Sequence, residues 1–232
     1  MGTNMIRKAM ITVGGSRTAL RAMYYPWRVM PYPIRRGATA LFITLVLAAK
    51  RLFRVDGQNE LTPATLMGSL SFWGVPEIDL NQYSLTIDGA VAQARTLSID
   101  QLRAQPSCSR LVRMDCVGGF RNNSIMDGVL LRQLLQESGV EPGARRAVFH
   151  CADGYRVALD LEDLLGKEAF LAYSFNGEET ARFGFPLRLA IPGKYGYQWA
   201  KWVTRIELVA REPKGYWGNL GLPDRADIGD RW

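Results

Sequence analysis

Cys116 is the residue of this 232-residue chain whose type and setting best suit redox or metal chemistry. Its segment, Arg113-Met-Asp-Cys-Val-Gly-Gly-Phe120, runs from an expected strand into a loop with paired glycines. A thiolate is the reactive and metal-binding form of cysteine, and soft sulfur suits soft or redox-active metals. Because free cysteine is among the most buried residue types, inert packing is the alternative for this thiol.

A second chemically suggestive segment is Pro192-Gly-Lys-Tyr-Gly-Tyr-Gln-Trp-Ala-Lys-Trp202. Its two glycines would let backbone amides point into a concavity, and Lys194 and Lys201 add positive charge. These are the features of a phosphate or pyrophosphate site. Arg188, in the strand expected just before, could add a bidentate clamp. The alternative is an aromatic-rich loop with solvated lysines.

Several other chemistries find no support in the sequence. With one histidine and three cysteines, the chain has no Cys-x-x-Cys or His-x-x-x-His pair for a tetrahedral zinc site. A nucleophilic triad would have to use His150, for which we expect instead a hydrogen-bonded structural role. Dinucleotide-binding and P-loop motifs are also missing from the sequence.

Charge divides the chain into two parts. Residues 1–54 contain ten basic and no acidic side chains, which leaves 19 basic and 22 acidic side chains in the remainder. A nucleic-acid-binding domain would carry its basic patch on the folded unit, and here that unit is mildly acidic. We therefore expect no nucleic acid partner, and we interpret residues 1–54 as a basic leader or a membrane-associated segment.

The N-terminal part also holds a short apolar run. Residues 38–49 are almost entirely apolar, follow Arg35-Arg36 and precede Lys50-Arg51. Twelve residues are too few to span a bilayer, which needs about 20, but they suit a signal-peptide core or an interfacial helix. Export on a twin-arginine leader predicts a periplasmic or membrane-associated protein. An organelle presequence and a core helix of a cytoplasmic protein are the alternatives, and Met23 or Met30 could be the true start.

Residues 60–232 are expected to form one domain, because no linker or repeat divides them. Alternating apolar residues and turn signals such as Asn176-Gly177 predict several short strands. The expected strands are 83–87, 111–115, 147–149, 155–159, 171–175, 187–191 and 203–209, and the expected helices are 98–102, 129–135 and 161–165. Short strands with only short helices indicate an α+β, strand-rich fold with mixed sheets rather than a doubly wound sheet.

Taken in order, these segments resemble a known family, the molybdopterin-binding oxidoreductase domain of the sulfite-oxidase type. The similar motifs are Cys116-Val-Gly-Gly-Phe, Gly128-Val-Leu-Leu-Arg-Gln-Leu-Leu135, Asp153-Gly-Tyr, Leu171-Ala-Tyr with Asn176-Gly-Glu, Gly184-Phe-Pro-Leu-Arg-Leu-Ala-Ile-Pro-Gly-Lys-Tyr-Gly-Tyr, and Lys201-Trp-Val-Thr-Arg-Ile-Glu-Leu208. The resemblance covers about residues 74–217. It implies a molybdenum-molybdopterin cofactor with Cys116 as the metal ligand. It also implies that Arg188, Lys194 and Lys201 bind the pterin phosphate, with Tyr197 and Gln198 close to it.

The resemblance further implies two-electron oxygen-atom transfer on a small molecule, in which the cofactor performs the redox step. Arg113 and Arg121 flank Cys116 and could position an oxyanionic substrate, although structural ion pairing would suit them equally. The short relatives include a bacterial methionine-sulfoxide reductase that works with a membrane haem partner, which points to S-oxide reduction and a haem or quinone-linked electron donor. The alternative is a cofactor-free binding module, or a membrane-surface interaction module, on the same fold.

Overall fold

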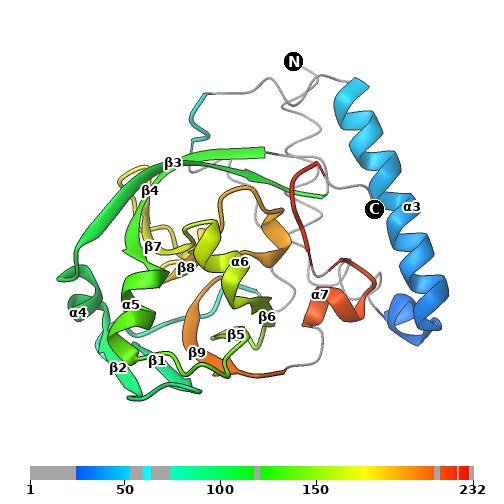
Figure 1. Ribbon diagram of the computed structural model, residues 1–232. Coiled ribbons are helices and arrows are strands. Elements are labelled where there is room, and N and C mark those ends of the chain that lie inside the picture. The colour runs from blue at the N-terminus through cyan, green and yellow to red at the C-terminus, as the bar shows by residue number, and fades with distance from the viewer. Residues whose placement is uncertain are drawn as a thin grey trace.

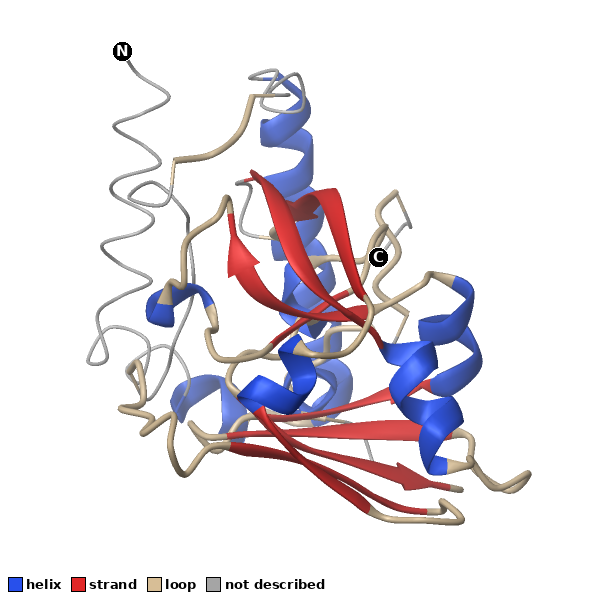
Figure 2. Ribbon diagram, turned by 90° about the vertical axis from the view of Figure 1, so that its left-hand side faces the viewer, coloured by secondary structure: helices blue, strands red, loops and turns tan. Residues whose placement is uncertain are grey.

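The computed structural model describes residues 25–52, 60–63, 74–117, 121–211, 215–223 and 225–229. Two β-sheets stand at an angle to each other with short helices beside them, and one long helix lies at the edge of the molecule (Figures 1 and 2). The first 24 residues and the loop Gly118-Gly-Phe120, which figured in the sequence predictions, lie outside the described residues.

The larger sheet has five strands in the order β2-β1-β9-β5-β6. Their bounds are β1 Ser84–Gly89, β2 Arg95–Ser98, β5 Arg146–Cys151, β6 Arg156–Asp160 and β9 Val203–Val209. β1 and β9 run parallel, and the other neighbouring pairs are antiparallel. Every second residue of β1 is buried, as expected for a strand with one face on the core.

The smaller sheet has four antiparallel strands in the order β3-β4-β7-β8. Their bounds are β3 Ser107–Asp115, β4 Arg121–Leu130, β7 Phe170–Phe175 and β8 Arg188–Ala190. The apolar residues of both sheets belong to one hydrophobic core. Because they share this core, the two sheets fix the positions of the end of β3, next to Cys116, and the start of β8, at Arg188.

Most helices are short. They are α4 Ile99–Arg103, α5 Leu131–Ser138, α6 Leu161–Gly166, α7 Tyr216–Asn219 and the 3₁₀ turns η3 Ala181–Phe183 and η4 Gly196–Gln198. Ser98 closes a capping box with Gln101, and the Asp160 side chain accepts a hydrogen bond from the Asp163 amide. Gly139 ends α5 in the left-handed conformation, with a φ of 67°.

The predicted α+β fold of mixed sheets with short helices is confirmed. Asn176 and Gly177 both have positive φ angles, as the predicted hairpin turn requires. Two details differ from the prediction. The helix predicted for residues 129–135 begins only at Leu131, because residues 129 and 130 belong to β4, and neither β4 nor β2 was predicted as a strand.

Gly128 of β4 permits close approach to β7. A Cβ atom at this position would lie 2.1 Å from the Leu171 carbonyl oxygen. Because this neighbour is backbone in a paired strand, it cannot move aside as a side-chain tip would. We expect Gly128→Ala to lower the free energy of unfolding by about 3 kcal/mol, as overpacking typically does. Denaturant unfolding would measure this change, and an unchanged midpoint would contradict the close packing of these strands.

The long helix, α3 (Tyr32–Leu52), includes the apolar run of residues 38–49. It packs against the C-terminal segment after α7 (Figure 1). The Thr39 hydroxyl donates a hydrogen bond to the Leu220 carbonyl oxygen at 3.0 Å, and Ile43 is buried against Leu220 and Leu222. Among the described helices, none combines the length and the apolar character needed to cross a membrane.

Candidate functional site

Cys116 follows the last residue of β3 and is buried, with 8% of its surface exposed. The end of β3 is fixed by the segment after β8. Asp115 forms a parallel bridge with Tyr195, and Gly196 lies against Met114, whose side chain a Cβ would approach to 3.0 Å. Cys116 is a thiol and forms no disulfide with the other two cysteines.

Arg188 and Lys201 lie opposite each other in an isolated antiparallel β-bridge. The Arg188 side chain is buried, donates a hydrogen bond to the Phe183 carbonyl oxygen at 2.7 Å, and contacts the Met114 sulfur at 2.9 Å. Met114 is two residues before Cys116 on the same stretch of chain. Two of the three basic residues predicted to bind a phosphate therefore lie together, beside the strand that precedes the predicted metal ligand.

Arg188 lacks a carboxylate partner within the described part of the chain and contacts the Phe183 ring instead, at 4.4 Å from the ring centroid. Among the described residues, its buried Nε atom has no hydrogen-bond partner. Burial lowers the pKa of Arg188 to about 9. Burial, and then repulsion by Arg188, lowers the pKa of Lys201 to about 7, while attraction to Asp153 opposes this shift. A buried cation is stable where a counter-charge approaches it, so the pair is suited to an anionic group.

The backbone around the pair is tightly constrained. Gly184 has a φ of 121°, and a Cβ there would lie 3.0 Å from the Arg188 Cβ and 3.2 Å from the Lys201 Cγ. Trp202, which is fully buried, has a φ of 54°, an uncommon conformation for a residue other than glycine. Its indole Nε1 donates to the Ala181 carbonyl oxygen at 2.8 Å, which helps to hold this geometry. Strained backbone is concentrated at functional sites.

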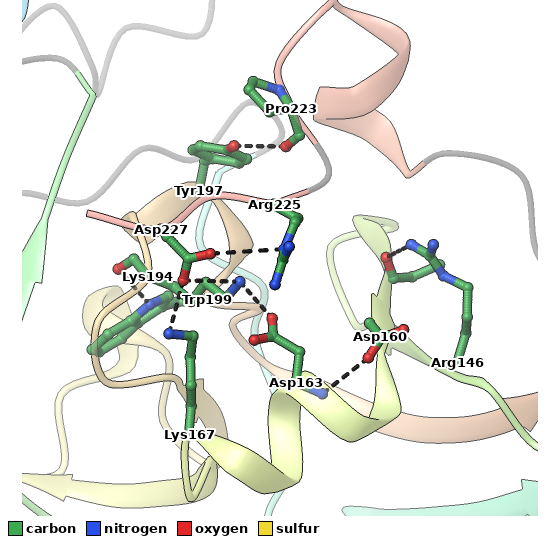
Figure 3. Close-up of polar contacts among 11 residues, drawn as sticks. Arg146, Asp160, Asp163, Lys167, Lys194, Tyr197, Trp199, Pro223, Arg225 and Asp227 are labelled. Atoms are coloured by element: carbon green, nitrogen blue, oxygen red, sulfur yellow. Dashed lines mark hydrogen bonds and ion pairs between the residues drawn. The ribbon is translucent and has the colours of Figure 1, made fainter. Parts of the chain in front are cut away.

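Lys194 occupies a different environment, shown in Figure 3. Its buried ammonium forms ion pairs with Asp163 of α6 and with Asp227, the latter at 3.2 Å. Lys167 also reaches Asp227, at 2.8 Å, and these two lysines lower the pKa of that carboxyl. Lys194 and Gln198 line a cavity of about 620 Å³ whose lining does not include Arg188 or Lys201. Unlike Arg188, Lys194 thus has carboxylate partners among the described residues, and its role as a phosphate ligand stays a prediction.

Tyr197 links the candidate site to α3. Its hydroxyl donates to the Pro223 carbonyl oxygen at 2.7 Å (Figure 3), and its own carbonyl oxygen accepts from the Tyr155 hydroxyl at 2.8 Å. Its ring belongs to an apolar cluster that includes Val117, the residue after Cys116, and Ile43 of α3. One apolar cluster therefore joins the neighbour of Cys116 to the long helix.

The two arginines that flank Cys116 differ in their surroundings. Arg121 forms a two-contact ion pair with Asp115, at 2.9 and 3.0 Å, and both side chains are buried. Arg113 is exposed. Both line a cavity of about 630 Å³ whose lining does not include Cys116. Their substrate role stays a prediction, and the ion pair gives Arg121 a clear structural role as well.

His150 has the hydrogen-bonded state that we expected. Its Nε2 lies 2.9 Å from a Glu207 carboxylate oxygen across the β5–β9 pair. The sequence analysis assigned no site role to Asp153 or Cys151. Both nevertheless interact electrostatically with Lys201, and burial raises the pKa of each. The Asp153-Gly-Tyr motif was the available signal for them.

The lowered pKa of Lys201 predicts a pH dependence for anion binding. A bound anion raises the pKa of Lys201, so above about pH 7 binding must take up a proton. The affinity of cofactor-free protein for sulfate, whose charge is constant here, should be greatest below pH 7 and then fall by at most about tenfold per pH unit. Calorimetric titration would measure it. A flat profile in the unmodified protein, or the same slope in Lys201→Met, would contradict this assignment.

The residues present fit the cofactor that the sequence resemblance implies. A phosphate would complete the hydrogen bonding of the orphaned Arg188 Nε and neutralise the Arg188–Lys201 pair. A thiolate at Cys116 would supply the soft ligand that molybdenum favours. In the described residues, no group of three or more histidine, cysteine and acidic side chains forms an alternative metal site.

Comparisons with known proteins identify the family of this chain. The family of oxidoreductase molybdopterin binding domains matches residues 72–217, which include Cys116, Arg188 and Lys201. YedZ1 of Azospira oryzae is 30% identical over 148 residues, which are 63% of this chain and 56% of that protein. The protein-methionine-sulfoxide reductase catalytic subunit MsrP of Gluconobacter oxydans is 29% identical over 187 residues, which are 72% of this chain and 57% of MsrP.

The sulfane dehydrogenase SoxCD of Paracoccus pantotrophus has a similar structure. Its TM-score is 0.62 at 23% identity, over 68% of this chain and 46% of that chain, which supports the fold alone. This chain therefore spans only about half the length of these known proteins. The family match covers more than half of this chain and includes both sheets. This chain belongs to the family of oxidoreductase molybdopterin-binding domains.

Proposed function

We propose that this protein is a molybdenum-molybdopterin enzyme that transfers an oxygen atom in a two-electron reaction, with S-oxides as its substrate class. The observation that carries the proposal is the pair formed by buried Arg188 and half-buried Lys201. Among the described residues, Arg188 has no ion-paired carboxylate, and it contacts Met114 of the strand that ends just before Cys116. A buried guanidinium is costly unless an anionic group binds there.

Each residue has a definite role in this proposal. Cys116 provides a thiolate ligand to the metal, and Arg188 and Lys201 bind the cofactor phosphate. Lys194, with its carboxylate partners, holds the segment between β8 and β9 in place, and Tyr197 and Gln198 support the same segment. When bound, the cofactor supplies two-electron redox chemistry that no amino-acid side chain provides. A chain with one histidine can therefore catalyse a redox reaction.

S-oxide reduction is the specific reaction that we favour. In it the S–O bond breaks, and the S-oxide takes up two electrons and two protons to give a thioether and water. The similarity to MsrP, which is described as a protein-methionine-sulfoxide reductase catalytic subunit, supports this substrate class. The electrons would come from a membrane haem or quinone-linked partner. Arg113, which is exposed and lines a cavity of about 630 Å³, is our candidate for contacting a polar substrate.

Expression of the full chain in a host that makes the cofactor tests the proposal. Metal analysis and pterin fluorescence of the purified protein should find molybdenum and pterin in equal amounts. Their absence would refute the cofactor assignment. A screen of S-oxides and N-oxides with a reduced dye would then test the substrate class. A loaded protein that consumes N-oxides but no S-oxide would refute the substrate while leaving the cofactor assignment intact.

A further inference from the structure

The outward face of α3 is strongly apolar although it points away from the domain. Four large apolar side chains, Ile34, Leu41, Phe42 and Leu45, are each between 58% and 63% exposed. Their spacing of three, four and seven residues places them along one side of the helix. We call these four residues the outer face. Single exposed apolar residues are ordinary, but a continuous stripe of this kind marks an interaction surface.

The opposite side of α3 is firmly attached to the domain. Ile43 is only 2% exposed, and Thr39 both donates to the Leu220 carbonyl and accepts a hydrogen bond from the Trp27 indole at 3.1 Å. Gly221 lies so close to the helix that a Cβ there would be 2.8 Å from the Arg36 Cα. The helix is therefore held with its outer face exposed along one edge of the molecule (Figure 1).

The charge of this part of the chain identifies the partner. Residues 1–54 contain ten basic and no acidic side chains, whereas the rest of the chain has a slight acidic excess. Arg28 and Arg36 are exposed beside or on α3. An apolar stripe on a helix in a wholly basic segment has the composition of a helix that lies in the interface of an anionic bilayer. A protein partner would require no such uniform charge.

We propose that α3 lies flat on an anionic lipid surface, with the outer face inserted among the lipid headgroups and acyl chains. The domain would then be held at the membrane by a helix that packs on it rather than by a spanning segment. The apolar cluster behind α3 contains Val117, so the membrane contact and Cys116 lie on the same side of the domain. This proposal does not depend on the cofactor and stands if the enzymatic function fails.

Sedimentation of the full chain with lipid vesicles tests it. Vesicles of phosphatidylcholine with phosphatidylglycerol should bind the protein, and vesicles of phosphatidylcholine alone should bind it less. Raising the salt concentration should weaken the binding. The triple variant Leu41→Gln, Phe42→Gln, Leu45→Gln should lower the partition coefficient by at least about tenfold, because each side chain loses apolar burial. Because these side chains are exposed, the melting temperature should stay unchanged.

A matched triple variant controls for the loss of apolar surface in general. Leu111→Gln, Ile125→Gln, Ile228→Gln changes three exposed apolar residues outside α3, which are 67%, 39% and 39% exposed. This variant should bind vesicles as the unmodified protein does. Equal loss in both variants, or no binding to anionic vesicles, would overturn the proposal. Binding to native membranes but not to protein-free vesicles, or a dimer that the α3 variant dissociates, would assign the outer face to a protein partner and overturn it too.

Discussion

Cys116→Ser should abolish turnover while the protein keeps its fold. A serine hydroxyl is a hard, weakly acidic ligand and does not replace a thiolate on a soft, redox-active metal. The loss should exceed the roughly 100-fold that removal of an outer-shell partner costs a metal site. The fold should survive because serine is close to cysteine in volume and Cys116 lies at the end of β3 rather than within the main core cluster. Steady-state assays with a reduced dye and circular dichroism would measure the two effects.

Cys108 and Cys151 are the controls for this experiment. Cys108 is partly exposed on β3, and we expect Cys108→Ser to keep nearly full activity. Cys151 is buried, and its thiol interacts with Lys201, so Cys151→Ser should have a mild effect. Turnover by Cys116→Ser equal to that of the unmodified protein would refute the ligand assignment. Loss of activity that follows a lowered melting temperature in all three variants would mean that the effect is on stability instead.

The sequence predicted the sheet strands whose apolar residues alternate or form continuous runs, because such patterns are local. It missed β4 because residues 121–124 of that strand are polar and nevertheless buried. Hydrogen bonds to residues distant in the sequence make this burial possible. The Asn123 amide donates to the Thr62 hydroxyl at 3.0 Å, and its side chain donates to the Glu60 carbonyl at 3.1 Å. No local pattern could indicate these partners 60 residues away.

The candidate site was also predictable only in part, because its motifs are local in the sequence but some contacts between its residues are not. The sequence order and the family resemblance identified Cys116, Arg188 and Lys201 as residues that act together, and the structure brings the last two side by side. The sequence alone could not show that Lys194 and Lys201 have different surroundings, because both are lysines of one loop. Their difference arises from Asp163 and Asp227, which come from α6 and from the C-terminal segment. The two carboxylates are 64 residues apart in the chain and meet only in the folded protein.

This difference between the two lysines leads to the second large prediction. Lys201→Met should lower the affinity for the cofactor by about 10- to 100-fold, the range expected for loss of a hydrogen bond to a charged group. The cofactor-free protein should be as stable as before or more stable, because a cation whose burial already lowers its pKa to about 7 is removed. Pterin content after dialysis and thermal unfolding of the cofactor-free protein would measure the two quantities.

Lys194→Met should behave in the opposite way. It removes the Lys194 partner of Asp163 and leaves Asp227 with Lys167, so the free energy of unfolding should fall by about 2 kcal/mol, the value typical of a hydrogen bond to a charged group. Cofactor affinity should change less than in Lys201→Met, because two carboxylates already bind the Lys194 ammonium. If Lys194→Met instead loses the cofactor at unchanged stability, Lys194 is a phosphate ligand and its ion pairs are replaced when the phosphate binds. If Lys201→Met retains the cofactor and is destabilised, the Arg188–Lys201 pair is structural, and the observation that carries the proposed function fails with it.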